Sequence, residues 1–437
     1  MGNFIGIHVI KNYNPGLFNR DMNNEAKQVR VGSVNRSRIS PYALKRVLRE
    51  EMEVDELRAA HLEDFIEKLL MNCVKDETLT QEEADKIGEF ICSKDVLGSD
   101  SWKKRASVAA KKESDTKQTK KESDSDSTKE NADKKGRQII VTNDMELMAI
   151  YDSIMKAKAD GCLFDKNGNI DKKATVKTIK AALDNVDVSI AKALFGTFPN
   201  SGVIETVDGA VQMAHAFSID EYRPEVDDFV GKFSSHFKEK ADPFYAALSD
   251  FSANESNKTA ADAMGSSDVY SNTMYLYSNI NIRELLRNLR TCASGKMSTE
   301  RDAAVMNVIS SQVPLYIEKF INGMPAAKQH SGSSHCDAAI ALIECIENGN
   351  NSQPDFNRVI KYDRDRDVGV AEQGIEVIHR WASDDTFRTG NVRRYVMLGA
   401  EYKKYTQDFE ENGIVIIHNP NELCDIMRKE SVKLAID

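Results

Sequence analysis

Positively charged side chains gather near the start of the sequence, in a pattern suited to binding a chain of phosphate groups. Residues 1–50 contain nine Lys or Arg and three acidic residues, although the whole chain of 437 residues has a net charge of −10. The nine are Lys11, Arg20, Lys27, Arg30, Arg36, Arg38, Lys45, Arg46 and Arg49. Such segregation focuses a positive field on one surface, which attracts a polyanion and reads its backbone with little base specificity.

The elements expected around these residues would bring several of them together. Residues 3–10 are β-branched and apolar, so they predict a buried strand. The loop that follows is rich in Asn, Pro and Gly and carries Arg20 and Lys27. Residues 28–32 alternate between apolar and polar types, which predicts a second, short strand.

A helix is predicted to begin at residues 40–41, with Ser40 as the N-cap and Pro at the first helical position. Arg36 and Arg38 lead into its N-terminus, which itself favours anions. Lys45 and Arg49 lie one turn apart on one face of this helix. These cations would form one track for phosphates, but a solvated helix face beside a basic loop explains the same composition and stays open.

The rest of the chain alternates between helical and strand-like patterns. Helices are expected within 51–102 and 138–195 and after 282, and strands within 203–219, 267–282 and 413–420. Residues 103–137 contain no aromatic residue and too little apolar surface to offset ordering entropy, so they are predicted to be disordered. Residues 220–268 are polar with isolated aromatics, which suits a projecting loop or hairpin. Those aromatics could wedge between bases or anchor the segment to the body.

Signatures of catalysis and metal binding are weak. The common phosphate-loop, dinucleotide, serine-hydrolase and zinc-protease motifs are missing. Residues 165–171 resemble a calcium loop with Gly at the wrong position. Arginines neutralise the alternating Asp residues of 363–367, and the His335–Cys336 pair is isolated. We therefore expect no metal, no cofactor and no catalytic residue. The seven scattered cysteines are typical of reduced thiols in the cytoplasm, and no apolar run reaches the ~20 residues of a membrane helix.

Several ordered stretches carry a family resemblance. At the start they are NFIGIHVI at 3–10, FNRDMNNEAKQVRVG at 18–32 and NRSRISPYALKRVLRE at 35–50. Further along they are ALFG at 193–196, VDGAVQMAHAFS at 207–218, YLYSNINIRELLRNL at 275–289 and MPAAKQH at 324–330. Across residues 1–330, this set resembles the CasC family, the backbone subunit of the type I-E CRISPR Cascade complex.

The resemblance implies an α+β fold, with a modified RRM-like (ferredoxin-type) palm, a helical fingers insertion and a protruding thumb. It places the first part of the palm with its basic helix at 1–50, the fingers with their disordered insertion at 51–190, palm again at 191–219, the thumb at 220–268, and the palm completion with C-terminal helices at 269–437.

The resemblance also implies a non-catalytic protein that polymerises along CRISPR RNA and presents its bases for pairing with target DNA in antiviral defence. The implied partners are CRISPR RNA, target DNA by way of the guide, copies of the chain in a filament and other Cascade subunits. From the basic cluster and the resemblance together, the expected RNA-binding residues are Arg20, Lys27, Arg36, Arg38, Ser40, Lys45, Arg46 and Arg49, with Phe198 and Phe229 as aromatic residues that stack or wedge at a kink in the RNA.

Two departures and two rival functions accompany this prediction. Thr197 and Phe198 stand where the family usually has Arg-Met, which removes a cation, and the thumb is longer than usual. The base-reading signature of RRM domains is absent, so the sheet face is not expected to read bases. The rivals are an RRM-type CRISPR RNA-processing endonuclease, with His8 or His215 as general base, and a DNA-binding regulator, for which no helix-turn-helix is evident.

Overall fold

The structure is a computed structural model that describes residues 2–23, 25–54, 57–59, 62–98, 140–231, 263–325 and 335–436. Its helices are α1 (Pro41–Glu51), α2 (Leu62–Lys75), α3 (Gln81–Cys92), α6 (Asp144–Ala159), α7 (Lys172–Leu183), α8 (Ile190–Phe195), α10 (Ile282–Leu289), α11 (Asp302–Asn322), α13 (Val370–Ala382), η1 (Ala400–Tyr405), α14 (Thr406–Glu411) and α15 (Pro420–Ile436). Its strands are β1 (Gly2–Asn12), β2 (Gln28–Val31), β3 (Val34–Ile39), β4 (Leu57–Ala59), β5 (Ile140–Thr142), β6 (Val211–Met213), β7 (Ala216–Ser218), β8 (Glu225–Gly231), β9 (Ala263–Val269), β10 (Thr273–Asn281), β11 (Ala338–Gly349), β12 (Asn391–Leu398) and β13 (Val415–Ile416).

A nine-stranded mixed sheet organises the molecule, in the order β13-β12-β11-β1-β10-β7-β3-β2, with β6 also pairing with β10. Every pairing in it is antiparallel except that of β12 with β13. The strand predicted at residues 3–10 is β1, which lies between β10 and β11, with His8 opposite Tyr277 and Leu342. Because side chains alternate along a strand, a central strand covered on both faces is apolar almost throughout.

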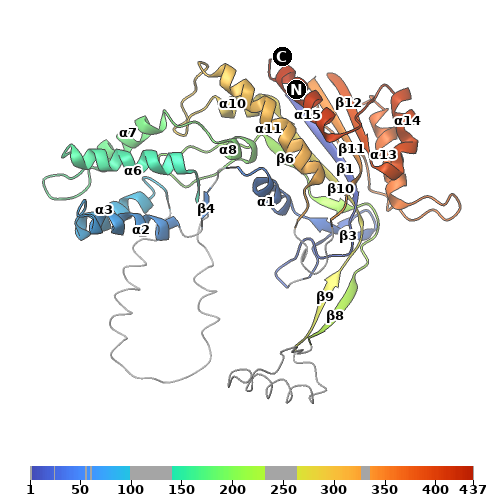
Figure 1. Cartoon of the computed structure of the whole chain (residues 1–437), viewed down its shortest axis with the longest axis horizontal. Coiled ribbons are helices and arrows are strands. Elements are labelled where there is room, and N and C mark those ends of the chain that lie inside the picture. Colours follow the sequence, from blue (N-terminus) through green and yellow to red (C-terminus); the bar gives the residue numbers. More distant parts are fainter. Residues whose placement is uncertain are drawn as a thin grey trace, which may run out of the picture.

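Helices cover both faces of this sheet. On one face, Ile5, Ile7 and Val9 join a core built with α1, α8, α10, α11 and α15. On the other face, Ile10 and Tyr275 pack with α13 and α14. In Figure 1, α10, α11 and α15 lie on one side of the strands, and α13 with α14 on the other. This arrangement confirms the α+β class.

A helical part lies beside the sheet, where α2, α3, α6 and α7 enclose their own cluster of buried apolar side chains. Figure 1 places these helices at the opposite end of the long axis from α13 and α14. A buried ion pair ties this part to the rest, since Lys192 of α8 donates to Oε1 of Glu146 on α6 at 2.6 Å. The presence of α2, α3, α6, α7 and α8 confirms the helices predicted within 51–102 and 138–195. The disorder predicted for 103–137 lies outside the described residues.

Strands β8 and β9 form a separate two-stranded hairpin, as the composition of 220–268 predicted. Figure 1 shows it projecting from the end of the sheet near β3, away from the covering helices. Aromatic contacts anchor its base: the Tyr270 ring lies 5.6 Å from that of Tyr222 and 5.5 Å from that of Phe18, measured between centroids. At least Tyr222 of the 220–268 segment therefore anchors the segment to the body, which is one of the two roles predicted for its aromatic residues.

The strand expected at 413–420 is shorter than predicted, because β13 spans only Val415–Ile416. It is confined between the turn at Gly413, which has a φ of 72°, and Pro420, where α15 begins. The strand expected at 267–282 is interrupted between Val269, where β9 ends, and Thr273, where β10 begins. None of the described helices is long and apolar enough to cross a membrane.

Candidate nucleic-acid interface

The predicted cations lie around one edge of the sheet, where β3 leads into α1. The Ser40 side chain caps α1 by accepting from the Ala43 amide, as the sequence predicted. The backbone amide of Ser40 donates to Oδ1 of Asn19 at 3.0 Å, which fastens the preceding loop to the start of the helix. That loop carries Arg20, whose backbone forms an isolated β-bridge with Ala26. The side chain of Arg20 is exposed. Asn19 is an organising residue that the sequence reasoning missed.

Lys27 and Arg38 face the same histidine. The Arg38 amide donates to the Lys27 carbonyl at 2.9 Å, and Nη1 of Arg38 lies 3.1 Å from Nδ1 of His215. Burial lowers the pKa of His215, and the positive charges of Arg38 and Lys27 lower it further. A loop cation and a strand cation therefore act on the same imidazole and share one electrostatic environment.

Lys45 and Arg49 extend this environment along α1. Nζ of Lys45 donates to the Val211 carbonyl of β6 at 3.3 Å, so the helix cation reaches the strand that leads to His215. The Arg49 guanidinium stacks 5.5 Å from the centroid of the Phe195 ring, which holds it one turn further along. We call Arg20, Lys27, Arg38, Lys45, Arg49 and His215 the basic surface.

Arg36 does not join this surface, and its predicted RNA contact needs correction. It is fully buried at 0% exposure, and its guanidinium donates to the carbonyls of Ser218, Ile219 and Asn357 at 3.0–3.2 Å. Three carbonyls from two distant segments accept from its two Nη groups, so its place is in the packing between β3, β7 and the loop after β11. Burial lowers the pKa of Arg36 from its ordinary value.

The side chains of Arg46 and Ser40 bond within or at the start of α1 and do not belong to the basic surface. Arg46 faces solvent and pairs with Glu50 one turn along α1, with Nε 2.7 Å from the carboxylate. Ser40 is 7% exposed, and its hydroxyl oxygen serves as the helix cap. Both remain near the predicted track, but neither converges on His215.

The two aromatic residues of the prediction lie apart. Phe198 follows α8 and is 74% exposed, so its ring is open to a stacking partner. Phe229 is on β8, where its backbone pairs opposite Gly265, and its side chain lies outside the described part. Tyr42, on the first turn of α1, is 86% exposed and was not singled out from the sequence. Its place within the Pro-Tyr-Ala-Leu-Lys stretch beside Lys45 was the available signal.

A family model described as CT1975-like protein matches residues 5–413, which is most of the chain. The chain belongs to the CT1975-like family. Solved structures of other proteins share its fold, and two of them are described below. A chain of a "CRISPR RNA-guided surveillance complex, pre-nicking" superposes with a TM-score of 0.62 at 17% identity, covering 98% of this chain and 100% of that one. A chain of a "CRISPR RNA-guided surveillance complex" gives 0.50 at 15% identity, with 98% of each chain covered. No curated protein matches the chain.

In this CT1975-like protein, the rival general base His8 is enclosed in the sheet. It is 0% exposed, its Nδ1 lies 2.9 Å from the Tyr275 hydroxyl, and its Nε2 lies 3.4 Å from Glu344. Burial lowers the pKa of His8, although Glu344 opposes the change. His8 therefore packs in the core rather than facing a substrate.

The weak metal motifs form ordinary turns in this CT1975-like protein. Residues 165–171 close a turn through a bridge between Phe164 and Ile170, and residues 363–368 do so through Asp363 and Val368. Within the described ranges, no group of three His, Cys, Asp or Glu side chains is placed to hold a metal ion.

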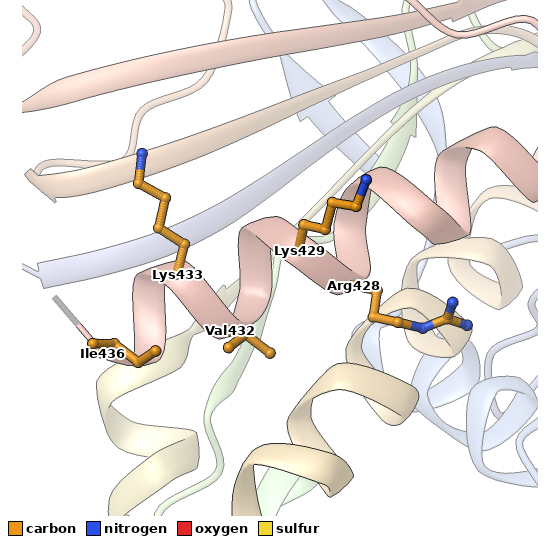
Figure 2. A pocket seen from close by; sticks show the side chains of 5 residues that line it. All are labelled: Arg428, Lys429, Val432, Lys433 and Ile436. Atoms are coloured by element: carbon orange, nitrogen blue, oxygen red, sulfur yellow. The ribbon is translucent and has the colours of Figure 1, made fainter.

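A shallow hollow runs along α15, lined by Arg428, Lys429, Val432, Lys433 and Ile436. Figure 2 shows Lys429 and Lys433 extending from one side of this helix and Arg428 from another. The hollow contains none of the predicted RNA-binding residues. Its cations can therefore be replaced as controls for substitutions in the basic surface.

Proposed function

We propose that this CT1975-like protein is the guide-RNA-binding backbone subunit of a CRISPR surveillance complex, of the CasC type found in type I-E Cascade. In this proposal it binds CRISPR RNA without cutting it and presents the bases for pairing with target DNA. Copies of the chain and other Cascade subunits are its protein partners. The two structures with this fold are chains of CRISPR RNA-guided surveillance complexes, and the motif resemblance points to the same kind of complex.

One observation carries the RNA-binding part of the proposal. Cations from a loop, a strand and a helix converge around His215: Lys27 and Arg38 both act on its charge, and Lys45 bonds the strand that precedes it. Convergent cations from several elements are what a phosphate backbone requires, whereas cations on a solvated face point apart. The contact pattern therefore favours the track over a merely solvated helix face.

We assign the parts of the chain accordingly. The large sheet with its covering helices would be the modified RRM-like palm, the α2, α3, α6 and α7 cluster the fingers, and the β8–β9 hairpin the thumb. In this assignment the Arg20, Lys27, Arg38, Lys45 and Arg49 side chains contact phosphates or sugars, and Phe198 and Phe229 stack or wedge at a kink in the RNA.

Expression of the tagged chain together with a CRISPR repeat-spacer array tests the proposal. The expected result is co-purification of RNA of discrete lengths that contains the spacer sequence, sensitive to high salt. Recovery of the chain free of RNA, or with random cellular RNA, would contradict it.

The endonuclease alternative is tested separately with labelled repeat RNA and the purified chain. We expect no cleavage, because His8 is enclosed and Nδ1 of His215 already contacts Nη1 of Arg38 at 3.1 Å. Specific cleavage that disappears in His215→Ala would favour the enzyme instead. Lys86→Ala, on the helical part, serves as the control variant.

A further inference from the structure

A cavity of about 320 Å³ opens where β6, β10 and the segment after β11 meet. Gln212 and Asn279 lie directly opposite each other in the β6–β10 pairing, with Tyr277 two residues before Asn279 on the same face. Asn351 and Gln353 line the cavity from the third segment. Side-chain carboxamides therefore surround this cavity from three separate stretches of sequence.

The carboxamide of Asn279 is the deepest polar group in the cavity, with 2% exposure. Its Nδ2 donates to Oε1 of Gln212 at 3.4 Å and to the Tyr277 hydroxyl at 3.3 Å. Its Oδ1, by contrast, accepts no hydrogen bond from any described residue although it is buried. A buried acceptor without a donor is unfavourable, so a ligand that brings an N–H group would satisfy it.

The chemistry of the lining selects the class of ligand. Among the residues that the structure describes, no charged side chain lines the cavity, so neither a phosphate nor a metal ion finds its counter-charge there. Carboxamides pair with the edges of nucleobases, and unpaired RNA bases are typically bound by such edges and by aromatic side chains. Because each carboxamide offers both donors and an acceptor, the same cavity can accommodate different bases.

The cavity is also adjacent to the basic surface. Ala214, which contributes to its lining, directly precedes His215, whose ring contacts Arg38 at 3.1 Å. A nucleotide whose phosphate lies against Arg38 would therefore have a neutral hydrogen-bonding cavity within one residue of that contact.

We propose that this cavity binds one unpaired nucleobase of an RNA strand whose phosphates lie on the basic surface. The inference rests on the proposed RNA-binding function and adds a base contact to it. The two glutamines at the rim, Gln212 and Gln353, are exposed, so their replacement by Ala leaves the core intact.

The test is a thermodynamic cycle with Gln212→Ala/Gln353→Ala and two strands, a single-stranded RNA and an equally long sugar-phosphate strand without bases. We expect the double variant to bind the RNA about tenfold more weakly than the wild type and the baseless strand equally well. The matched control is Gln81→Ala/Gln407→Ala, two exposed glutamines on α3 and α14, which should bind both strands as the wild type does.

The possible outcomes distinguish a failure of the base-binding inference from a failure of the proposed RNA-binding function. If the wild type binds both strands tightly and the double variant loses nothing, or loses equally on both, the cavity does not take a base although RNA binding stands. If the wild type binds neither strand at low salt, the proposed function fails and the inference with it. Crosslinking of 4-thiouridine RNA should attach to peptides containing Met213 or Tyr277, and attachment only elsewhere would also overturn the inference.

Discussion

At the residue scale, Arg36 and Arg38 show how neighbouring cations on one strand acquire different roles. Both lie on β3, two residues apart and therefore on the same face. Arg36 is enclosed by the carbonyls of Ser218 and Asn357, whereas Arg38 sits against His215 at the sheet edge. The two arginines differ in role because distant segments of the chain place carbonyl groups against Arg36 and a histidine against Arg38.

The helix cations give the first residue-scale prediction. Lys45→Ala with Arg49→Ala should weaken RNA binding equally across sequences and reduce the dependence of log K on log salt by about two, because each phosphate contact releases counterions. Fluorescence anisotropy at several salt concentrations measures this slope. Arg428→Ala with Lys429→Ala, two cations of α15, is the matched control and should leave it unchanged. A loss that depends on sequence would exclude phosphate contacts.

Glu344 gives a pH prediction. It is 1% exposed and accepts from Arg388 at 3.1 Å and from Arg394 at 3.0 Å. Burial raises the pKa of this carboxyl, but His8 and the two arginines outweigh burial and lower the pKa from 4.5 to about 2. A lowered folded-state pKa means that the ionised form stabilises the fold above pH 4.5 and that this contribution is lost as the pH falls toward 2.

Glu344→Gln should therefore reduce the free energy of unfolding at neutral pH by on the order of 3 kcal/mol. It should also flatten the loss of stability on acidification. Urea unfolding at pH values from 7 to about 3 checks both effects, with the exposed Glu401→Gln as control. Because burial also lowers the pKa of His8 from 6.5, His8 contributes a further decrease in stability below that pH in both proteins. A pH profile unchanged by Glu344→Gln would contradict the assignment.

At the scale of elements, β3 and α1 form one unit that carries strand and helix cations with a fixed spacing. The Ser40 cap sets where the helix begins, and Leu44 and Leu48 bury its apolar side. Lys45 and Arg49 consequently emerge toward β6 and α8 rather than into bulk solvent. The helix thus positions its charges through packing, not through an interaction among them.

The β8–β9 hairpin gives a prediction at the same scale. Within the described part of the chain its strands pair only with each other, and Glu225 lies opposite Val269 at its base. Replacing residues 226–268 by a short Gly-Ser linker should change the melting temperature by less than about 4 °C, because Tyr222 and Tyr270 remain. The same deletion should weaken RNA complexes if the hairpin is the thumb. Circular dichroism melting and sedimentation of RNA complexes measure the two effects, and a marked loss of thermal stability would show that the hairpin holds the sheet.

At the scale of the whole molecule, a chain that binds an RNA backbone and its own copies head to tail should assemble by RNA length. Mass photometry of complexes formed on RNAs of increasing length should give masses that rise in equal steps of one subunit. The RNA-free chain serves as the control and should show no such ladder. A single mass that does not depend on RNA length would contradict a repeating assembly.

Local patterns in the sequence determined a good part of this protein. Alternation and β-branching predicted β1 and β2, and the Ser-Pro pair predicted the start of α1. The isolated aromatics predicted a projecting loop or hairpin at 220–268, and the structure has a hairpin. These features depend on residues near each other in the chain. The density of Lys and Arg in residues 1–50, together with the family resemblance, predicted Arg38, Lys45 and Arg49 as RNA-binding residues.

Only the tertiary structure decided which of these charges are available to a ligand. Arg36 is buried by carbonyls more than 180 residues away, and Arg38 meets a histidine 177 residues away. The cavity between β6, β10 and the segment after β11 likewise combines Gln212, Asn279 and Gln353 from three segments. Burial and charge depend on what packs against a side chain, and that is set by strand pairing across the whole sheet rather than by neighbours in sequence.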